Sequence, residues 1–441
     1  MSPSLRGPLL FGLMAAALIV VGFAQSWSVA LGIVNLCLIS SVMALGVNIQ
    51  WGYAGLFNVG AMGFAAVGGV AVVLVSAPPV REGWAAGWSG LGLAFLAAAA
   101  TVAAILLIRR RMERGGARSL AIAAAAAVGY FLARQAFDPA VEAVERINPA
   151  LSGYLGGLGL PVLLAWIVGG VLAAGVAWLI GKVTLGLRSD YLAIATLGIS
   201  EIIVFIAKNE DWLTRGVKNV TGLPRPVPKE IDLQQADWFI ARAASFGLAP
   251  MEASLIYVKL AYAGLFVTVL LALLWLAERA LNSPWGRMMR AIRDNEEAAE
   301  AMGKDVTRRR LQTFVLGSAV CGIAGAMLTT LDGQFTPGTY NPLRFTFLIW
   351  VMVIVGGSGN NWGSVLGGFL IWFVWVEAEP AGRWLMDVAT SGMSEGSALR
   401  DHLLDSAAYM RMILMGLILL VALRFSPRGL LPEKMQLGRR A

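Results

Sequence analysis

VALGIVNLCLISSVMALGVNI, which is residues 29–49, decides the class of fold because it contains no charged side chain. An α-helix rises about 1.5 Å per residue, so roughly 20 apolar residues cross the ~30 Å hydrocarbon core of a bilayer. Eleven further apolar runs occupy residues 9–25, 59–78, 89–108, 119–137, 160–181, 191–207, 255–277, 313–331, 345–356, 364–376 and 409–425. The short pair 345–356 and 364–376 fits either two spans or one broken hairpin. The sequence therefore predicts an all-α, polytopic transmembrane helix bundle of about 10–12 spans.

The composition excludes most other classes of protein. Of the 441 residues, 58% are hydrophobic and 14% are charged, whereas a soluble domain carries roughly a quarter charged residues. One histidine, His402, and two cysteines, Cys37 and Cys321, do not supply the usual ligands of a metal site or the members of a catalytic triad. We therefore predict one transmembrane domain over residues 1–441, with no metal, no cofactor and no enzyme activity of its own.

The net charge of +8 is concentrated in short loops, so we interpret it as a signal of membrane topology rather than of nucleic-acid binding. If the N-terminus is inside and twelve spans follow, four basic stretches fall on the inner side. They are 109–118, 182–190, 278–312 and the tail with Arg424, Arg428, Lys434, Arg439 and Arg440. The opposite loop is acidic and contains Glu377, Glu379, Asp387, Glu395, Asp401 and Asp405. We expect loop 278–312 to be cytoplasmic and loops 208–254 and 377–408 to be periplasmic.

Residues 1–25 allow two interpretations. Arg6 before an apolar run, and Gly22-Phe23-Ala24 near its end, fit a secretory signal peptide. The first helix of a polytopic membrane protein has the same pattern, and we favour that interpretation.

Two glycine-rich segments interrupt the apolar runs, at residues 48–60 and 356–363. Glycine lets the backbone turn sharply. Irregular backbone at membrane depth occurs only where protein or a water-filled cavity provides hydrogen bonds to its N–H and C=O groups. Each segment therefore either lines a path or forms a tight turn. The first segment supplies most of the candidate residues of a translocation path, which are Asn48, Gly52, Gly55, Asn58 and Gly60.

Glu201 is the remaining candidate for the path, because it lies within the apolar run 191–207. An ionisable group at that depth costs about 2–4 kcal/mol unless it is paired or hydrated. Glu201 either lines a path or locks two helices together, or it lies near a short helix's outer end and pairs with a neighbour such as Lys208.

The basic stretch 278–312 contains the strongest local signals. Ser283-Pro284 predicts the N-cap and first position of a helix. Asp294, with Glu297 three residues later, predicts a capping box at the start of a second short helix, and Gly303 predicts its end. We expect Ala298 and Ala299 on the surface of that helix. It either fits into a groove of a partner protein or lies on the bilayer surface.

The chain has no recognisable phosphate-binding loop. Gly181-Lys182-Val183 is the nearest candidate, but valine occupies the position where the P-loop needs serine or threonine for the metal. Any ATP must be hydrolysed by another protein.

Several segments together resemble a known family. The pattern Glu297-Ala298-Ala299-x-x-x-Gly303 resembles the EAA signature of ABC importer permeases. Over about two thirds of the chain, the sequence is similar to the branched-chain amino acid permease family of LivM type. The matching segments are 48–69, 187–198, 282–287, 291–296, 322–326, 355–359, 362–363 and 427–432. Residues 79–160 match little of the family pattern, and Thr214-Arg215-Gly216 replaces a frequent Thr-Gly-Gly.

This resemblance implies a permease subunit of the type II-like group of ABC importers in a bacterial inner membrane. It implies a heterodimer with a second, homologous permease subunit, two cytoplasmic ATP-binding subunits that bind ATP and Mg²⁺, and a periplasmic substrate-binding protein. It also implies that the coupling segment, containing Asp294, Glu297, Ala298, Ala299 and Gly303, contacts an ATPase. The substrate is then a branched-chain or related amino acid, although relatives also move urea and short amides.

Two other functions compete with this interpretation. A proton- or sodium-driven secondary carrier would work alone and would need coupling charges near the middle of the membrane, where Glu201 is the one strong candidate. A membrane-embedded enzyme or a channel would need a catalytic cluster or a repeated filter motif, and we identify neither.

Overall fold

The computed structural model describes residues 3–148, 153–393 and 397–433. Glu395 of the acidic loop, and Lys434, Arg439 and Arg440 of the basic tail, lie outside the described residues. Within the described residues, ten helices are long and apolar enough to cross a membrane, and two shorter apolar helices are Ala61–Ser76 and Pro342–Gly356. The predicted all-α fold of about 10–12 spans is confirmed.

Each of the twelve predicted apolar runs lies in a helix of its own. These helices are α1 (Pro3–Ala24), α2 (Trp27–Ala54), α3 (Ala61–Ser76), α4 (Arg81–Arg111), α5 (Gly116–Glu145), α6 (Val162–Thr184), α7 (Ser189–Asn209), α11 (Pro250–Asn282), α14 (Val306–Asp332), α15 (Pro342–Gly356), α16 (Asn361–Ala389) and α18 (Met410–Phe425). The pair α15 and α16 therefore forms two helices, which are joined by the turn 357–360.

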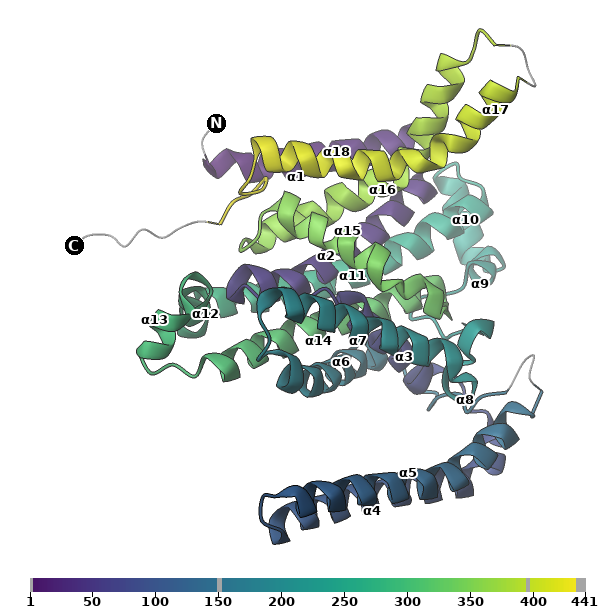
Figure 1. Cartoon of the computed structure of the whole chain (residues 1–441). Coiled ribbons are helices and arrows are strands. Elements are labelled where there is room, and N and C mark those ends of the chain that lie inside the picture. Colours follow the sequence, from purple (N-terminus) through teal and green to yellow (C-terminus); the bar gives the residue numbers. More distant parts are fainter. Residues whose placement is uncertain (1–2, 149–152, 394–396, 434–441) are drawn as a thin grey trace.

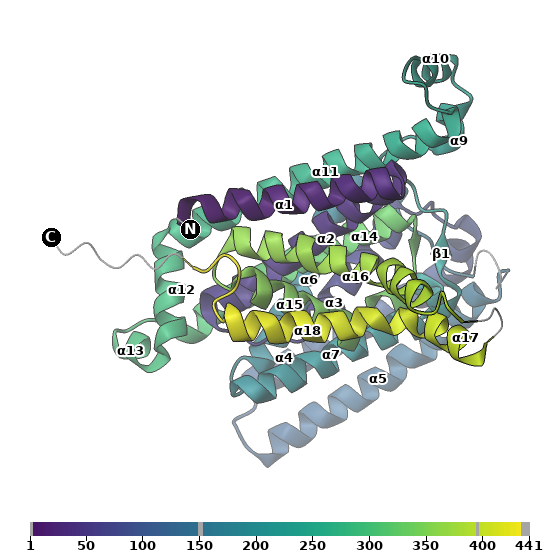
Figure 2. The same ribbon diagram turned by 90° about the horizontal axis from the view of Figure 1, so that it is seen from above.

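Shorter elements lie at the two ends of the bundle. One end contains α12 (Pro284–Asp294) and α13 (Glu296–Ala301), and it also holds the start of α1 and the end of α18 (Figures 1 and 2). The other end contains α9 (Glu230–Gln234), α10 (Asp237–Ser245) and α17 (Ala398–Asp405). Near α7 and α14 lie α8 (Asp211–Thr214), η1 (Gly216–Lys218), β1 (Val220–Thr221), β2 (Gln334–Phe335) and η2 (Pro337–Tyr340), and η3 (Ser406–Tyr409) precedes α18. Strands β1 and β2 pair antiparallel, with Val220 opposite Phe335.

The core forms around α2, α3 and α14, whose backbones approach closely because small residues lie at their contacts. A Cβ on Gly325 of α14 would lie 1.9 Å from the carbonyl oxygen of Ala65 in α3. A Cβ on Gly68 of α3 would lie 1.8 Å from the carbonyl oxygen of Gly322. Such small-residue contacts are the usual way in which membrane helices pack, because lipid gives no hydrophobic drive for helix association.

Helices α4 and α5 form a hairpin at the edge of the molecule. They pack along each other, and Figure 1 shows the hairpin separated from the bundle except at the end near α8. At that end, a backbone hydrogen bond from Val80 N to Leu155 O (3.1 Å) closes the hairpin, and others attach it to the bundle, from Leu155 N to Trp212 O (2.9 Å) and from Leu158 N to Leu74 O (3.0 Å). Residues 79–160, which match little of the family pattern, therefore contain a peripheral helical hairpin.

Candidate functional site

The coupling segment begins as the sequence predicts. Ser283 is the N-cap of α12, where its hydroxyl oxygen accepts a hydrogen bond from Gly286 N at 3.3 Å, and Pro284 takes the first helical position. A Cβ on Gly286 would lie 2.3 Å from the carbonyl oxygen of Leu281, so the entry into α12 is tightly packed. Helix α12 therefore leaves the end of α11 in a fixed direction.

The start of α13 differs from the prediction by one residue. Asn295, with φ −156° and ψ 102°, is the N-cap, and its side chain accepts a hydrogen bond from Ala298 N at 3.0 Å. Asp294 is instead the last residue of α12, so Glu297 is not placed to complete a capping box. The predicted end is confirmed, because Gly303 has φ +74°, in the left-handed region that favours glycine.

The exposed surface of α13 also differs from the prediction. Glu297 and Ala298 are exposed, but Ala299 is buried, with 9% of its surface accessible. One apolar side chain that the sequence analysis missed, Met302, is 78% exposed directly before Gly303. An apolar residue beside the terminating glycine of a polar loop was the available signal. Within the chain, Arg310 Nη1 of α14 holds α13 through Glu296 Oε1 at 2.6 Å.

The two glycine-rich segments lie against each other at the C-terminal end of α2 and the N-terminal end of α16. Asn48 is fully buried; its Nδ2 donates to Asn361 Oδ1 (3.1 Å), and its Oδ1 accepts from Gly359 N (2.8 Å). A Cβ on Gly52 would lie 2.3 Å from Asn48 Oδ1 and 2.5 Å from Gly359 N. In this conformation Asn48 and Gly52 therefore join helices and do not line an open path.

A second buried cluster joins the loop after α2 to α14. Gln50 Nε2 donates to Phe314 O (2.9 Å) and to Ser318 Oγ (3.0 Å). Asn58 Nδ2 donates to Gln50 Oε1 (2.8 Å), while Asn58 Oδ1 accepts from Gly60 N (2.8 Å). Buried amides that are satisfied in this way fix the relative positions of the helices that carry them.

Among the predicted path residues, Gly55 borders a cavity. Gly55 has φ +65° and ends α2 in the left-handed conformation. The cavity, of about 490 Å³, is also lined by Leu56, Arg188, Thr307 and Arg310, at the end of the bundle that carries α12 and α13. Polar side chains therefore gather where the loop after α2 meets the start of α7.

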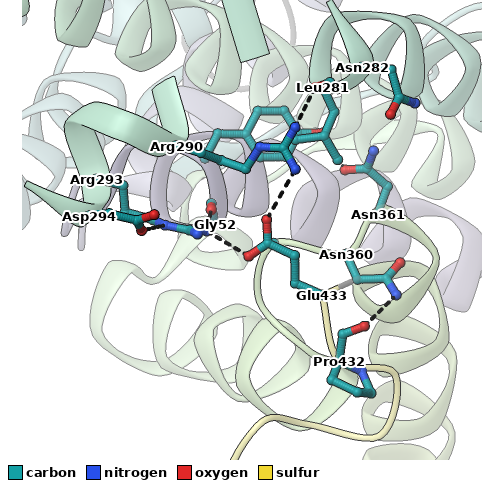
Figure 3. A network of polar contacts seen from close by, with 12 residues as sticks. Gly52, Leu281, Asn282, Arg290, Arg293, Asp294, Asn360, Asn361, Pro432 and Glu433 are labelled. Atoms are coloured by element: carbon teal, nitrogen blue, oxygen red, sulfur yellow. Dashed lines mark hydrogen bonds and ion pairs between the residues drawn. The ribbon is translucent and has the colours of Figure 1, made fainter. Parts of the chain in front are cut away.

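A network of ion pairs connects α12 to the transmembrane helices (Figure 3). Arg293 Nη1 donates to the carbonyl oxygen of Gly52 in α2, and the same guanidinium pairs with Glu433 Oε2 at 3.0 Å. Arg290 Nη1 lies 3.7 Å from Glu433 Oε1. The sequence analysis did not single out these residues, because nothing in the sequence brings Glu433 next to α12.

The segment before Glu433 is fixed to the turn between α15 and α16. Leu430 N donates to Val355 O (2.8 Å), and Leu431 N donates to Gly356 O (2.9 Å). Asn360 Nδ2 donates to Pro432 O at 3.2 Å (Figure 3). Residues 429–433, which we call the tail strap, thus join α12 to the adjoining ends of α15 and α16.

Glu201 does not belong to these clusters. It is exposed on α7, and the described residues provide no ion pair or hydrogen bond for its side chain. The predicted pairing with Lys208 does not occur in this structure. Of the predicted path residues, the structure thus brings together Asn48 and Gly52, and separately Asn58 and Gly60, but places Glu201 apart.

Comparison with known proteins identifies the family. The family profile described as branched-chain amino acid transport system / permease component matches residues 112–423. The chain is 28% identical over 288 residues to the "Probable branched-chain amino acid transport permease protein LivM" of Methanocaldococcus jannaschii, covering 65% of this chain and 71% of the relative. It is 26% identical over 295 residues to the "High-affinity branched-chain amino acid transport system permease protein LivM" of Escherichia coli, covering 66% and 61%.

A shorter match concerns a different permease of the same archaeon. The chain is 31% identical over 129 residues to the "Probable branched-chain amino acid transport permease protein LivH" of M. jannaschii, covering 29% of this chain and 40% of the relative. The aligned part spans less than two thirds of the E. coli relative. No solved structure matches the chain. Because the family profile covers more than half of its length, this multi-pass membrane protein belongs to the branched-chain amino acid transport system / permease component family.

Proposed function

We propose that the chain is the transmembrane permease subunit of a binding-protein-dependent ABC importer for branched-chain or related amino acids. The importer contains a second, homologous permease subunit, two cytoplasmic ATP-binding subunits and a periplasmic substrate-binding protein. ATP and Mg²⁺ bind to the ATP-binding subunits. The complex lies in the lipid of a bacterial inner membrane, with α12 and α13 on the cytoplasmic side.

One observation supports the coupling role most directly. The exposed surface formed by Ala298 of α13 and by Met302 after it projects from the bundle, and the junction of α12 and α13 is tied to several parts of the chain (Figure 1). Arg293 connects α12 to Gly52 of α2 and to the tail strap, and Glu296 connects α13 to Arg310 of α14. A movement of α13 is therefore transmitted to α2, to the tail strap and to α14.

The mechanism follows from these connections. The binding protein delivers the amino acid to the end of the bundle that carries α9, α10 and α17. Binding of ATP closes the ATPase subunits and moves α13, and α12 carries this movement to α2 and α16. In this structure the two glycine-rich segments hold α2 tightly against α16. They separate or re-pack as access alternates between the two sides of the membrane.

A secondary carrier is the alternative, and the charge distribution disfavours it. Ion coupling needs ionisable groups that face the interior of the bundle or a water-filled cavity, and Glu201 lies on the exposed face of α7. The buried polar residues Asn48, Gln50 and Asn58 are amides, which do not titrate.

The test compares two identical substitutions at the same end of the molecule. Ala298→Trp enlarges the exposed surface of α13, whereas Ala117→Trp enlarges the exposed start of α5. We expect Ala298→Trp to lower recovery of the ATPase subunits with the permease at least roughly tenfold, which is a loss of about 1.4 kcal/mol. Ala117→Trp should retain both recovery and uptake. Ala299 is unsuitable, because it is buried within the chain.

Leucine uptake into membrane vesicles completes the test. Uptake by the complete importer should stop with vanadate and persist when a protonophore removes the proton gradient, provided that ATP is supplied. Uptake that stops with the protonophore and resists vanadate would identify a secondary carrier and reject the proposal. Uptake of urea or acetamide in place of leucine would retain the ABC importer and change its substrate.

A further inference from the structure

Most ionisable side chains within the described spans have a hydrogen-bond or ion-pair partner in the chain. Lys259 Nζ donates to Ser28 Oγ at 2.8 Å, Gln25 Nε2 donates to Glu377 Oε2 at 2.7 Å while Glu377 Oε1 is buried without a partner, and Glu379 pairs with Arg383 at 3.1 Å. Glu201 is an exception within the described part of the chain, since neither oxygen of its carboxylate has a partner there.

The position of Glu201 along α7 makes this exception significant. Helix α7 runs from Ser189 to Asn209. At about 1.5 Å per residue, Glu201 lies roughly 18 Å from the first residue and roughly 12 Å from the last. In a hydrocarbon core ~30 Å thick, the carboxylate is close to the middle. A glutamate side chain is too short to reach either interface from there, so the carboxylate needs a polar partner at its own depth.

The two faces of α7 have different surroundings. Thr196 and Ser200 face α3: the Thr196 hydroxyl accepts from Val59 N at 3.1 Å, and a Cβ on Gly63 would lie 2.7 Å from Ser200 Oγ. On the exposed face, Glu201 has Gly198 one turn before it and Phe205 one turn after it. A Cβ on Gly198 would meet nothing within 4 Å. The exposed face thus has one glycine beside the carboxylate, among large apolar side chains such as Ile194 and Ile202.

We propose that this face of α7 binds the second permease subunit, which presents a basic or hydrogen-bond-donating side chain to Glu201. The inference rests on the proposed function, because it needs a two-permease importer. Lipid does not fit this face, since acyl chains cannot satisfy a carboxylate. A packed helix fits both features, because small residues allow close approach of backbones and polar side chains hydrogen-bond across helix interfaces in membranes.

Helix α18 provides the comparison that makes the test specific. It is also largely exposed, but its arginines, Arg411 and Arg424, lie next to its two ends, so its middle is compatible with lipid. Gly416 lies in that middle part, is exposed, and like Gly198 has nothing within 4 Å of an added Cβ. Gly198→Trp and Gly416→Trp are therefore matched substitutions, and neither creates a clash within the chain.

The experiment uses the full chain expressed together with the homologous permease subunit of the same organism. Gly198→Trp should lower recovery of the second subunit at least roughly tenfold, and Gly416→Trp should change it less than about twofold. Glu201→Leu should also lower recovery, and Glu201→Gln should lower it less, because an amide still forms hydrogen bonds. Thermal stability of each purified variant alone should equal that of the unchanged chain.

The possible results separate this inference from the proposed function. If the unchanged chain brings down no second permease, the proposed two-permease importer is wrong. If it does, and Gly198→Trp and Glu201→Leu bring down as much, then α7 is not the contact surface and this inference is wrong. Full recovery with lost leucine uptake would place Glu201 on a water-filled path and would likewise overturn the proposed pairing.

Discussion

Helices α2 and α4 are both apolar and both longer than a bilayer requires, but they occupy opposite environments. In α2, 72% of the most apolar window is buried inside the molecule, whereas in α4 the share is 6%. Small residues do not explain the difference, because α4 is also rich in glycine and alanine. The amide side chains of Asn48 and Gln50 in α2 hydrogen-bond to neighbouring helices, whereas α4 has charged residues only near its ends. Hydropathy therefore identifies a span, and amide side chains within it indicate whether it is central.

The largest expected effect compares a glycine at the centre with one in the hairpin. Gly325→Leu places side-chain atoms where a Cβ alone would lie 1.9 Å from Ala65 O, so α3 and α14 must separate. Overpacking against backbone costs about 3 kcal/mol or more. We expect Gly325→Leu to remove most folded protein from the membrane, as measured by detergent-solubilised yield and size-exclusion profile.

Gly92 is the matched position in the hairpin. It lies on α4, and a Cβ there would meet nothing within 4 Å. Gly92→Leu should give the yield and profile of the unchanged protein. Equal loss of both variants would show that the α4–α5 hairpin is packed as tightly as the centre, and the comparison would fail.

A smaller effect compares two ion pairs. The Arg293–Glu433 pair connects α12 to the tail strap, and its side chains are 25% and 19% exposed. The Arg134–Asp138 pair lies within α5, with exposures of 52% and 49%. Breaking the first pair costs more, because it leaves a largely buried charge without a partner, whereas exposed pairs within one helix contribute about 0.3–0.5 kcal/mol.

We expect Arg293→Ala to lower leucine uptake roughly tenfold, a change of about 1.4 kcal/mol, while the ATPase subunits still bind. Arg293→Lys should restore part of the uptake, since the charge remains. The control replaces Arg134 and Asp138 together by leucine, which leaves no lone charge, and should retain uptake. Unchanged uptake by Arg293→Ala would show that this connection does not carry the coupling movement.

The sequence predicts the helices better than the contacts between them. Apolar runs locate the ten long and two shorter apolar helices of the described residues, because the bilayer requires hydrogen bonding within each segment. The cap at Ser283 and the stop at Gly303 are also local, and both are confirmed. Burial of Ala299 depends on the elements packed around α13, and the Arg293–Glu433 contact joins residues far apart in the sequence, so neither follows from a local pattern.

The choice between Asp294 and Asn295 as the N-cap illustrates the same limit at the scale of one residue. Both are good N-cap residues, and only the backbone decides between them. Helix α12 continues through Asp294, so Asn295 is the residue that has the extended backbone of an N-cap. Glu201 is the reverse case: the sequence marks an unusual residue, but the described part of the chain provides no partner for it.

The smallest effect is expected from removing the hairpin. Pro79 and Gly156 form an antiparallel bridge, and residues paired in this way have Cα atoms only about 4.5–5.5 Å apart. A linker of a few glycines can therefore replace residues 81–153 and leave Val80 and Leu155 hydrogen-bonded. Removing two antiparallel helices keeps the direction of every later span. We expect the shortened chain to insert, to bind the ATPase subunits and to retain at least about half of the leucine uptake, a change of less than ~0.5 kcal/mol. A shortened chain that folds but transports nothing would show that the hairpin takes part in transport, despite its position at the edge of the molecule.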